Sequence, residues 1–205
     1  MVASIARRTC LLAVTTGALA IGLPAQAQPD WVTALRSGGY VIVMRHGATH
    51  QDQADTDPLN LANVTRQRQL NDAGRAKAKE IGAAMKKLGI SVGQVITSQY
   101  FRAIETGRLL GFGEPQPTAD VSEGGQVVTP IENNRRTAAL RKLAATAVAG
   151  TNVLVVSHKP NILDAFGKDW FDIREGEISI FKPDGSGGYR LVARVQADEW
   201  AKLAQ

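Results

Sequence analysis

The 205-residue chain contains a single cysteine, Cys10, and only 5% of its residues are aromatic. A disulfide within the chain is thereby excluded, and so is a metal site built from several thiolates. The sequence also lacks internal repeats, low-complexity tracts and any long linker rich in proline, glycine or serine. Its 44% hydrophobic and 21% charged residues are typical of an ordinary globular domain. A domain of this length buries roughly 70% of the surface of its unfolded chain, so it needs no disulfide or structural metal for stability.

Residues 1–27 have the composition of a targeting segment. Arg7 and Arg8 form a positive region, residues 11–23 are apolar, and residues 25–27 (AQA) match a small-x-small cleavage site. We therefore predict a signal peptide over residues 1–27 and a periplasmic or secreted protein. The apolar run of 13 residues is shorter than the roughly 20 that span a bilayer, so no stable membrane span is expected after cleavage. The paired arginines leave the general secretory and the twin-arginine routes open.

Cleavage of this segment changes the charge balance of the chain. The full sequence has 24 Lys and Arg against 19 Asp and Glu, a net charge of +5. Because residues 1–27 contain two arginines and no acid, residues 28–205 keep 22 basic and 19 acidic side chains, a net charge of +3. They also contain no cysteine, which suits an oxidising compartment and excludes catalysis by a thiol.

Hydrophobic periodicity predicts a single α/β domain over residues 28–205. Short apolar runs rich in β-branched residues, at 40–44, 92–97 and 151–156, are typical of strands buried on both faces. The remaining elements are predicted as helices over 71–88, 98–110 and 131–148, a hairpin from 178–181 and 189–195, and a terminal helix over 198–203. This alternation predicts a three-layer α/β/α sandwich with a mostly parallel central sheet. Functional groups gather in such folds where strand carboxyl ends meet helix N-termini.

Residues with functional chemistry follow each of the three predicted strands. Arg45 and His46 follow the first strand, Arg102 falls in the first turn of the helix after the second, and His158 follows the third. An arginine in the first turn opposes the helix dipole unless an anion lies between them. We therefore expect these four side chains to bind a tetrahedral oxyanion, for which phosphate is the best fit. One imidazole attacks phosphorus while the arginines stabilise the phosphoryl oxygens, a mechanism that requires no metal or other cofactor.

The same motifs resemble those of the histidine phosphatase superfamily, whose fold is also called phosphoglycerate mutase-like. The resemblance covers nearly all of residues 28–205 and rests on residues 45–47 (RHG), 70–75 (LNDAGR), 98–106 (SQYFRAIET) and His158. It implies that His46 is the nucleophile that becomes phosphorylated, and that Arg45 and Arg102 bind the phosphoryl oxygens. It further implies that His158 supports the negative charge of the transferring group, and that the protein is a small exported member of the phosphatase type.

The resemblance leaves the general acid for the leaving group open. Mutase-like members carry a glutamate shortly after the strand that follows the second helix, and Glu123 is the best positional match. Acid-phosphatase-like members carry an aspartate directly after the late histidine, where this chain has Lys159. Glu175 and Glu177 are the alternative candidates. Some small members lack a clear acid and act on substrates with good leaving groups, phosphohistidine among them.

Several other polar residues have simpler interpretations. His50 lies in a polar loop, either solvated or at the rim of the substrate site. The spacing of Asp52, Asp55 and Asp57 lacks the glycine and terminal glutamate of an EF-hand, so we expect a solvated loop rather than a calcium site. Glu105 lies three residues after Arg102 and is expected to orient that arginine or to cap local structure.

The third predicted helix has a basic face. Its members are Arg135, Arg136, Arg141 and Lys142. We expect this face to be solvated, with contact to an anionic surface as the alternative. Because no aromatic side chains are interleaved with the basic ones, nucleic-acid binding is not expected.

Together these features predict a metal-independent phosphohydrolase that cleaves a phosphomonoester, or a similar phosphoryl bond, through phospho-His46. The expected partner is a small phosphorylated substrate or a phosphorylated component of the cell envelope. Two alternatives stay open: a phosphoglycerate mutase-type phosphotransferase and a non-catalytic phosphate-binding module. The first is disfavoured because mutases close over their substrate with longer insertions than this chain has. Neither the physiological substrate nor the oligomeric state follows from the sequence.

Overall fold

The computed structural model describes residues 28–124, 127–146 and 148–205, so the predicted signal peptide lies outside the described residues. A six-stranded sheet in the order β3-β2-β4-β1-β5-β6 forms the centre of the molecule. Its strands are β1 (Val41–Arg45), β2 (Val92–Ser98), β3 (Gln116–Thr118), β4 (Asn152–Ser157), β5 (Ile178–Pro183) and β6 (Tyr189–Val195). The first four strands of that order run parallel, and β5 and β6 form an antiparallel hairpin at the edge.

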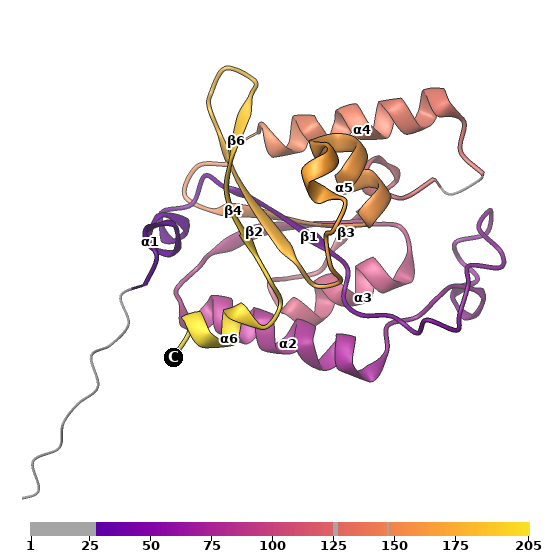
Figure 1. Ribbon diagram of the computed structural model, residues 1–205, viewed down its shortest axis with the longest axis horizontal. Coiled ribbons are helices and arrows are strands. Elements are labelled where there is room, and N and C mark those ends of the chain that lie inside the picture. The colour runs from indigo at the N-terminus through magenta and orange to yellow at the C-terminus, as the bar shows by residue number, and fades with distance from the viewer. Residues whose placement is uncertain (1–27, 125–126, 147) are drawn as a thin grey trace, which may run out of the picture.

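Helices cover both faces of this sheet. They are α1 (Asp30–Arg36), α2 (Asp72–Lys87), α3 (Phe101–Leu110), α4 (Pro130–Ala144), α5 (Lys159–Phe166) and α6 (Glu199–Leu203). Figure 1 shows α2, α3 and α6 on one side of the sheet and α4 and α5 on the other. The predicted three-layer α/β/α sandwich with a mostly parallel sheet is therefore confirmed. No helix in the described ranges is both long and apolar enough to cross a membrane.

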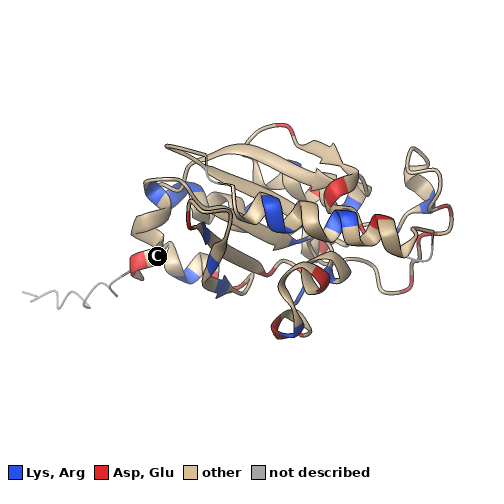
Figure 2. Cartoon of the chain, turned by 90° about the horizontal axis from the view of Figure 1, so that it is seen from above, with Lys and Arg blue, Asp and Glu red and all other residues tan. Residues whose placement is uncertain are grey.

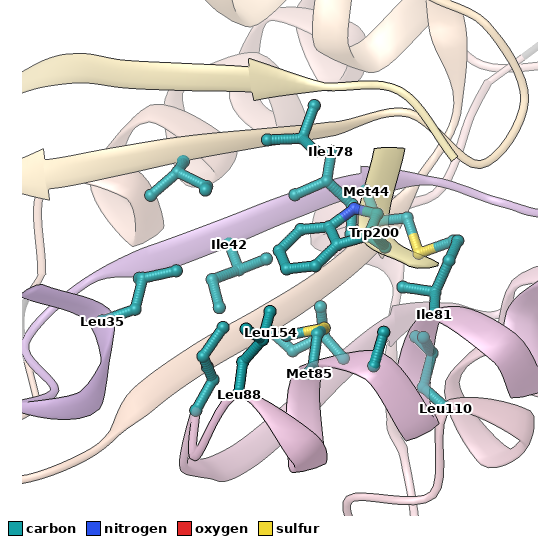
Figure 3. Packing of buried hydrophobic residues seen from close by; sticks show 14 of the residues in the cluster. Leu35, Ile42, Met44, Ile81, Met85, Leu88, Leu110, Leu154, Ile178 and Trp200 are labelled. Atoms are coloured by element: carbon teal, nitrogen blue, oxygen red, sulfur yellow. The ribbon is translucent and has the colours of Figure 1, made fainter. Parts of the chain in front are cut away.

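Alternate residues of β1 fill two separate cores. Ile42 and Met44 face α2 and α6, where Figure 3 shows Trp200 packed among the aliphatic side chains. Val41 and Val43 face the opposite core, which contains buried residues of α4 and α5. A central strand covered on both faces needs apolar residues at every position, which explains the unbroken apolar runs in the sequence. Polar side chains therefore first become tolerable where the central strands end.

The helix after β1 is fixed directly against the loop that carries the RHG motif. Asn71 caps α2, since its side chain accepts a hydrogen bond from the Gly74 backbone N–H at 2.8 Å. A Cβ at position 74 would collide with the Ala48 backbone, so only glycine allows this approach. Residues 70–75, which resemble the family's helix-opening segment, therefore make a close backbone contact with the loop that carries the RHG motif.

Several element boundaries differ from the predictions. The helix α3 begins at Phe101 rather than at Ser98, because Ser98 still belongs to β2 and pairs with Thr118 of β3. The helix α4 ends at Ala144 rather than at position 148. The sequence reasoning also missed α1, β3 and α5, which are short elements of 7, 3 and 8 residues.

Candidate active site

The two predicted site histidines meet at the carboxyl ends of adjacent parallel strands. Arg45 of β1 pairs in register with Ser157 of β4, and the next backbone N–H, that of His46, donates to the Ser157 carbonyl at 3.0 Å. The imidazole rings of His46 and His158 lie 5.1 Å apart between centroids, and each residue is 1% exposed. The structure therefore brings His46 and His158 together at one edge of the sheet, as predicted.

The orientation of His46 is set by its own turn. Its Nδ1 lies 2.8 Å from the Gly47 carbonyl oxygen. Because a carbonyl only accepts, Nδ1 carries the proton and Nε2 keeps its lone pair. The Gly47 N–H donates to Thr106 Oγ1 at 3.0 Å, and that hydroxyl donates to the Arg102 carbonyl at 2.7 Å, which ties the turn to α3.

The environment of His46 keeps its ring neutral. Burial lowers the pKa of His46 well below 6.5, and the neighbouring His158 and Arg102 lower it further. A neutral imidazole with an available Nε2 is the form that acts as a nucleophile.

Arg45 is held by the turn that precedes β5. Its guanidinium donates to the Ile173 carbonyl at 2.8 Å and lies 3.5 Å from the Glu175 carboxylate. The Gly176 N–H reaches the carbonyls of both Arg45 and His46, at 3.1 and 2.9 Å. Arg45 Nε is buried and has no hydrogen-bond partner. A segment far away in the sequence, residues 173–176, thus fixes this arginine while one of its donors remains unpartnered.

Arg102 has a fully buried side chain in the first turn of α3. Its guanidinium donates to Asp55 at 2.9 Å, forms an ion pair with Glu123, and lies over the Tyr100 ring at 4.4 Å from the centroid. The anion expected opposite this helix start is supplied here by two carboxylates. Arg102 Nε remains buried without a partner.

The sequence interpretation of Asp55 as part of a solvated loop is wrong. Its carboxylate is 21% exposed and accepts from both the Arg102 side chain and the Arg68 backbone. Nothing in the sequence distinguishes it from Asp52 or Asp57, since the contact arises only when the loop folds back over α3. The expectation that Glu105 orients Arg102 is also wrong. Its carboxylate accepts from Arg75 of α2 at 2.8 Å and not from Arg102.

His158 is fixed by residues of the β2–α3 junction. Its Nε2 lies 2.7 Å from Ser98 Oγ, and Tyr100 packs against the ring at 5.3 Å between centroids. Sequence reasoning used Ser98 only as part of a motif and assigned it no contact. His158 Nδ1 is buried, has no hydrogen-bond partner, and lies 3.4 Å from the Glu123 carboxylate. Burial lowers the pKa of His158 well below 6.5, with Arg102, Arg68 and Arg45 adding to the effect.

Among the candidate acids, Glu123 is the one that lies between Arg102 of α3 and His158, which follows β4. Its carboxylate contacts Arg102 and His158, and its side chain is 18% exposed. The backbone just before it is held from two helices, because Arg136 and Asn161 both donate to the Ser122 carbonyl at 3.0 Å. Glu123 therefore has a fixed backbone and a partly accessible carboxylate inside the site.

The two alternative acids occupy other positions. Glu177 is fully buried, and its carboxylate accepts from Arg194, from Gln196 and from the Arg174 N–H. These partners lie in β6, directly after it, or in the turn before β5, so the structure argues against Glu177 as the acid. Glu175 accepts from Thr49 Oγ1 at 2.7 Å and lies beside Arg45, at the rim of the site.

The three arginines on the basic face of α4 already have partners within the protein. Arg135 pairs with Glu132 and Asp120, and Arg136 pairs with Glu132. Arg141 donates to carbonyls at the C-terminal end of α5. Basic and acidic residues are also mixed over the molecule in the view of Figure 2. These contacts leave little support for the alternative of an anionic surface bound by this helix.

Unpartnered buried nitrogen atoms gather at the site. The described residues contain seven buried side-chain N or O atoms without a hydrogen-bond partner, and three of them are Arg45 Nε, Arg102 Nε and His158 Nδ1. A buried polar group left unsatisfied costs about 1–3 kcal/mol. Three of them around one imidazole indicate a place built to bind an anion. No group of three or more His, Cys, Asp or Glu side chains in the described ranges is arranged to hold a metal ion.

Comparison with protein families identifies the segment that carries most of these residues. Residues 41–124 match the family model described as "Histidine phosphatase superfamily (branch 1)". His158 lies beyond the matched segment. No curated protein matches the chain.

Solved structures extend the likeness to most of the chain. The protein histidine phosphatase SixA complexed with tungstate has a TM-score of 0.56 at 19% identity, covering 78% of this chain and 98% of that one. A mycobacterial glucosyl-3-phosphoglycerate phosphatase complexed with VO3 has a TM-score of 0.54 at 15% identity, with 76% and 98% covered. A structure named mycobacterial hydrolase 1 has a TM-score of 0.55 at 15% identity, with 76% and 97% covered. At these identities the likeness shows a shared fold.

Proposed function

We propose that this chain is a phosphatase of the histidine phosphatase superfamily, and that it cleaves phosphomonoesters or similar phosphoryl bonds by passing the phosphoryl group through His46. One observation carries the proposal. Three residues near His46 each have a buried nitrogen without a hydrogen-bond partner, and the imidazole of His46 has its Nδ1 held by a carbonyl while Nε2 keeps its lone pair. Tetrahedral phosphoryl oxygens match such donors, and the fold neighbours solved with tungstate and with VO3 are proteins that accept oxyanions.

In the first step, His46 Nε2 attacks phosphorus and the bond to the leaving oxygen breaks. The guanidinium groups of Arg45 and Arg102 donate to the phosphoryl oxygens and stabilise the charge that develops there. The Ser98 hydroxyl donates to Ser122 Oγ and accepts from His158 Nε2, which holds the ring with Nδ1 toward Glu123. A bound phosphoryl dianion favours uptake of a proton at this Nδ1, which then becomes a further donor toward the phosphoryl group. Glu123 gives its proton to the departing oxygen.

Binding of the substrate prepares Glu123 for this role. In the structure its carboxylate is paired with Arg102. A phosphoryl dianion competes for the same guanidinium and places negative charge beside the carboxylate. Both effects favour uptake of a proton by Glu123, because two anions at this distance repel each other. Glu123 therefore carries the proton that it gives to the leaving oxygen once the substrate is bound.

In the second step, water attacks phospho-His46, the phosphorus–nitrogen bond breaks, and His46 Nε2 recovers its lone pair. Glu123 takes the proton of the attacking water, and inorganic phosphate leaves. The protein's own residues supply every proton transfer in this scheme, so the proposal requires no metal.

The assay for this proposal is hydrolysis of an activated aryl phosphate between about pH 4 and 8, the range that spans carboxylate and imidazole titration. We expect turnover by the full chain, no loss with EDTA, and inhibition by vanadate, which mimics the phosphoryl transition state. Absence of turnover at every pH would leave the non-catalytic binding module as the better description. Interconversion of phosphoglycerates without phosphate release would favour the mutase. Loss of activity with EDTA would contradict the metal-free mechanism.

We also propose export of this protein to the periplasm or beyond the cell. The support is the positive, apolar and small-residue order of residues 1–27. N-terminal sequencing of the protein recovered from the cell envelope should begin at Gln28. Recovery of the full-length chain from the cytoplasm would contradict the proposal.

A further inference from the structure

The turn of residues 173–177, just before β5, contacts Arg45 at three points. The Ile173 carbonyl accepts from the Arg45 guanidinium at 2.8 Å, and the Glu177 carbonyl accepts from the Arg45 backbone N–H at 3.1 Å. The Gly176 N–H donates to the Arg45 carbonyl at 3.1 Å. Both the backbone and the side chain of Arg45 therefore depend on the path of this one turn.

The two arginines proposed to bind the phosphoryl group are oriented in different ways. Arg102 donates to the Asp55 carboxylate at 2.9 Å and also contacts a second carboxylate. Arg45 lies 3.5 Å from the Glu175 carboxylate and donates to a backbone carbonyl, that of Ile173. Its direction is therefore set mainly by the turn.

The carboxylate of Glu177 closes the turn from inside. Its Oε2 accepts from the Arg174 N–H at 3.0 Å, while the Glu177 N–H donates to the Arg174 carbonyl at 3.1 Å. The turn passes through Gly176 with a φ of 80°, a conformation that glycine adopts without strain. Because Glu177 is fully buried, its charge requires partners within the protein.

Arg194 of β6, the outer strand of the hairpin, is the cationic partner of this carboxylate (Figure 1). Its Nε donates to Glu177 Oε1 at 2.7 Å, and Gln196 donates to Oε2 at 2.7 Å. The same guanidinium donates to the Asp169 carbonyl at 2.6 Å and to the Asp172 carboxylate at 2.9 Å. One side chain thus joins β6 at three points to the segment that precedes β5.

Stability alone does not account for this ion pair. A buried carboxylate and guanidinium lose hydration that their attraction barely compensates, and apolar side chains of similar volume are often as stable. A planar guanidinium does fix the relative positions of the groups that accept from it, because its donors form a rigid fork. The acceptors of Arg194 lie within and just before the turn that contacts Arg45.

We propose that Arg194, acting through Glu177, is a positioning residue for Arg45. Its three contacts fix the turn, and the turn orients the unpartnered Nε of Arg45 toward a bound oxyanion. This inference rests on the proposed function in one respect, the binding of the phosphoryl group by Arg45. It adds a residue on the outer strand of the hairpin on which the affinity of the pocket depends.

Tungstate, a tetrahedral dianion, tests this role without turnover. Its binding to the full chain is measured by titration calorimetry in a phosphate-free buffer. Arg194→Gln should weaken binding about tenfold, because the turn no longer fixes Arg45. Arg194→Lys keeps a charge beside Glu177 but lacks the fork that joins three acceptors, so it should weaken binding about threefold.

A double-mutant cycle with Arg45 separates positioning from a general effect on the fold. Arg45→Lys keeps a charge in the pocket, so tungstate binding stays measurable, but it removes the Nε through which Arg194 acts. In this background Arg194→Gln should change the tungstate affinity by less than about twofold, whereas independent effects would add. Thermal unfolding checks that each variant is folded.

The matched control is Arg141 of α4. Its guanidinium also donates to backbone carbonyls, at 2.6 and 2.8 Å, but these carbonyls belong to α5 and not to the turn. Arg141→Gln removes the same charge from another structural contact. It should lower the temperature of unfolding and change the tungstate affinity by less than about twofold.

The outcomes separate this inference from the proposed function. Equal losses from Arg194→Gln in both backgrounds would overturn the inference, and so would an Arg194→Gln affinity within about twofold of the unmodified chain. If Arg194→Gln does not fold, the same two criteria apply to Arg194→Lys. If tungstate binds and aryl phosphate is not hydrolysed, the catalytic proposal fails while the cycle still decides the role of Arg194. If tungstate does not bind the unmodified chain, the phosphoryl pocket and the inference fail together.

Discussion

The arginines of α4 and those of the candidate active site show two uses of the same side chain. Arg135 and Arg141 on α4 donate to carboxylates or carbonyls of the protein, with two acceptors for Arg141 and two carboxylates for Arg135. Arg45 and Arg102 also have protein partners, yet each keeps a buried Nε that has none. The number of basic residues on a surface therefore says little about where an anion binds. Donors that the fold leaves unpartnered in a buried place are the better indicator.

The comparison also explains why the site tolerates its own carboxylates. The ion pairs of Arg135 are exposed and each is worth at most about 1 kcal/mol. Asp55 and Glu123 neutralise the fully buried Arg102, and without them an isolated cation would be costly inside the fold. A phosphoryl group that replaces one of them finds the arginine already oriented.

The largest expected effect concerns the nucleophile. His46→Ala should lower kcat for aryl phosphate by at least about 10⁴-fold, because it removes the group that forms the covalent intermediate. Steady-state kinetics of the purified variant measure this. The control is His50→Ala, which removes a histidine of the neighbouring loop and should change kcat by less than about threefold. Similar losses in both variants would contradict the assignment of His46.

The second prediction contrasts one arginine of each region. Arg102→Gln should lower kcat/KM by about 10²–10³-fold, since it removes charge-assisted donors from the phosphoryl oxygens. Arg135→Gln on α4 should stay within about twofold. Both variants are compared by kcat/KM and by thermal unfolding, so that a folding defect is recognised. An Arg135 variant as impaired as the Arg102 variant would remove the distinction between the two regions.

The third prediction concerns Glu123 and depends on the leaving group. Glu123→Gln should lower hydrolysis of an alkyl phosphate by about 10²-fold, because a poor leaving oxygen needs a proton. Hydrolysis of an activated aryl phosphate should change much less. Glu132→Gln on α4 is the control and should affect neither substrate. Intact alkyl phosphate hydrolysis in the Glu123 variant would exclude this residue as the acid.

The fourth prediction follows from the lowered pKa values of His46 and His158. Below about pH 6.5 the unfolded chain binds protons at these residues that the folded chain does not, so stability falls as pH falls from the ordinary histidine value toward the lowered one. The loss amounts to at most about 1.4 kcal/mol per pH unit and histidine. Urea unfolding at pH 7.5 and 5.5 in phosphate-free buffer should show a smaller decrease for His46→Asn than for the unmodified chain. An equal decrease in both would contradict the buried, neutral state of His46.

The smallest expected effect belongs to α4. Arg141→Gln should lower the free energy of unfolding by about 0.5–1 kcal/mol, because the guanidinium donates to carbonyls in the last turn of α5. Its kcat should remain unchanged. Urea unfolding and kinetics on one preparation measure both quantities, and a fall in kcat without a fall in stability would assign this arginine to the site after all.

Much of the site follows from the sequence because parallel strands bring their carboxyl ends to one edge. The positions of Arg45, His46 and His158 require only that the apolar runs form central strands, and Arg102 requires only that a helix follows the second of them. Asp55 is different, since its contact with Arg102 depends on the path of a long loop without periodic pattern. The short elements α1, β3 and α5 escape prediction for a related reason, because so few residues show no period.

The account's central claim is that His46 carries the phosphoryl group during turnover. Its most direct measurement is rapid acid-free quenching of the enzyme with labelled substrate, followed by mapping of the bound phosphate by mass spectrometry. We predict an acid-labile, base-stable phosphate on the imidazole of His46, formed within one turnover and absent from His46→Ala. Full turnover with no covalent phosphate, or with phosphate on another residue, would contradict the claim.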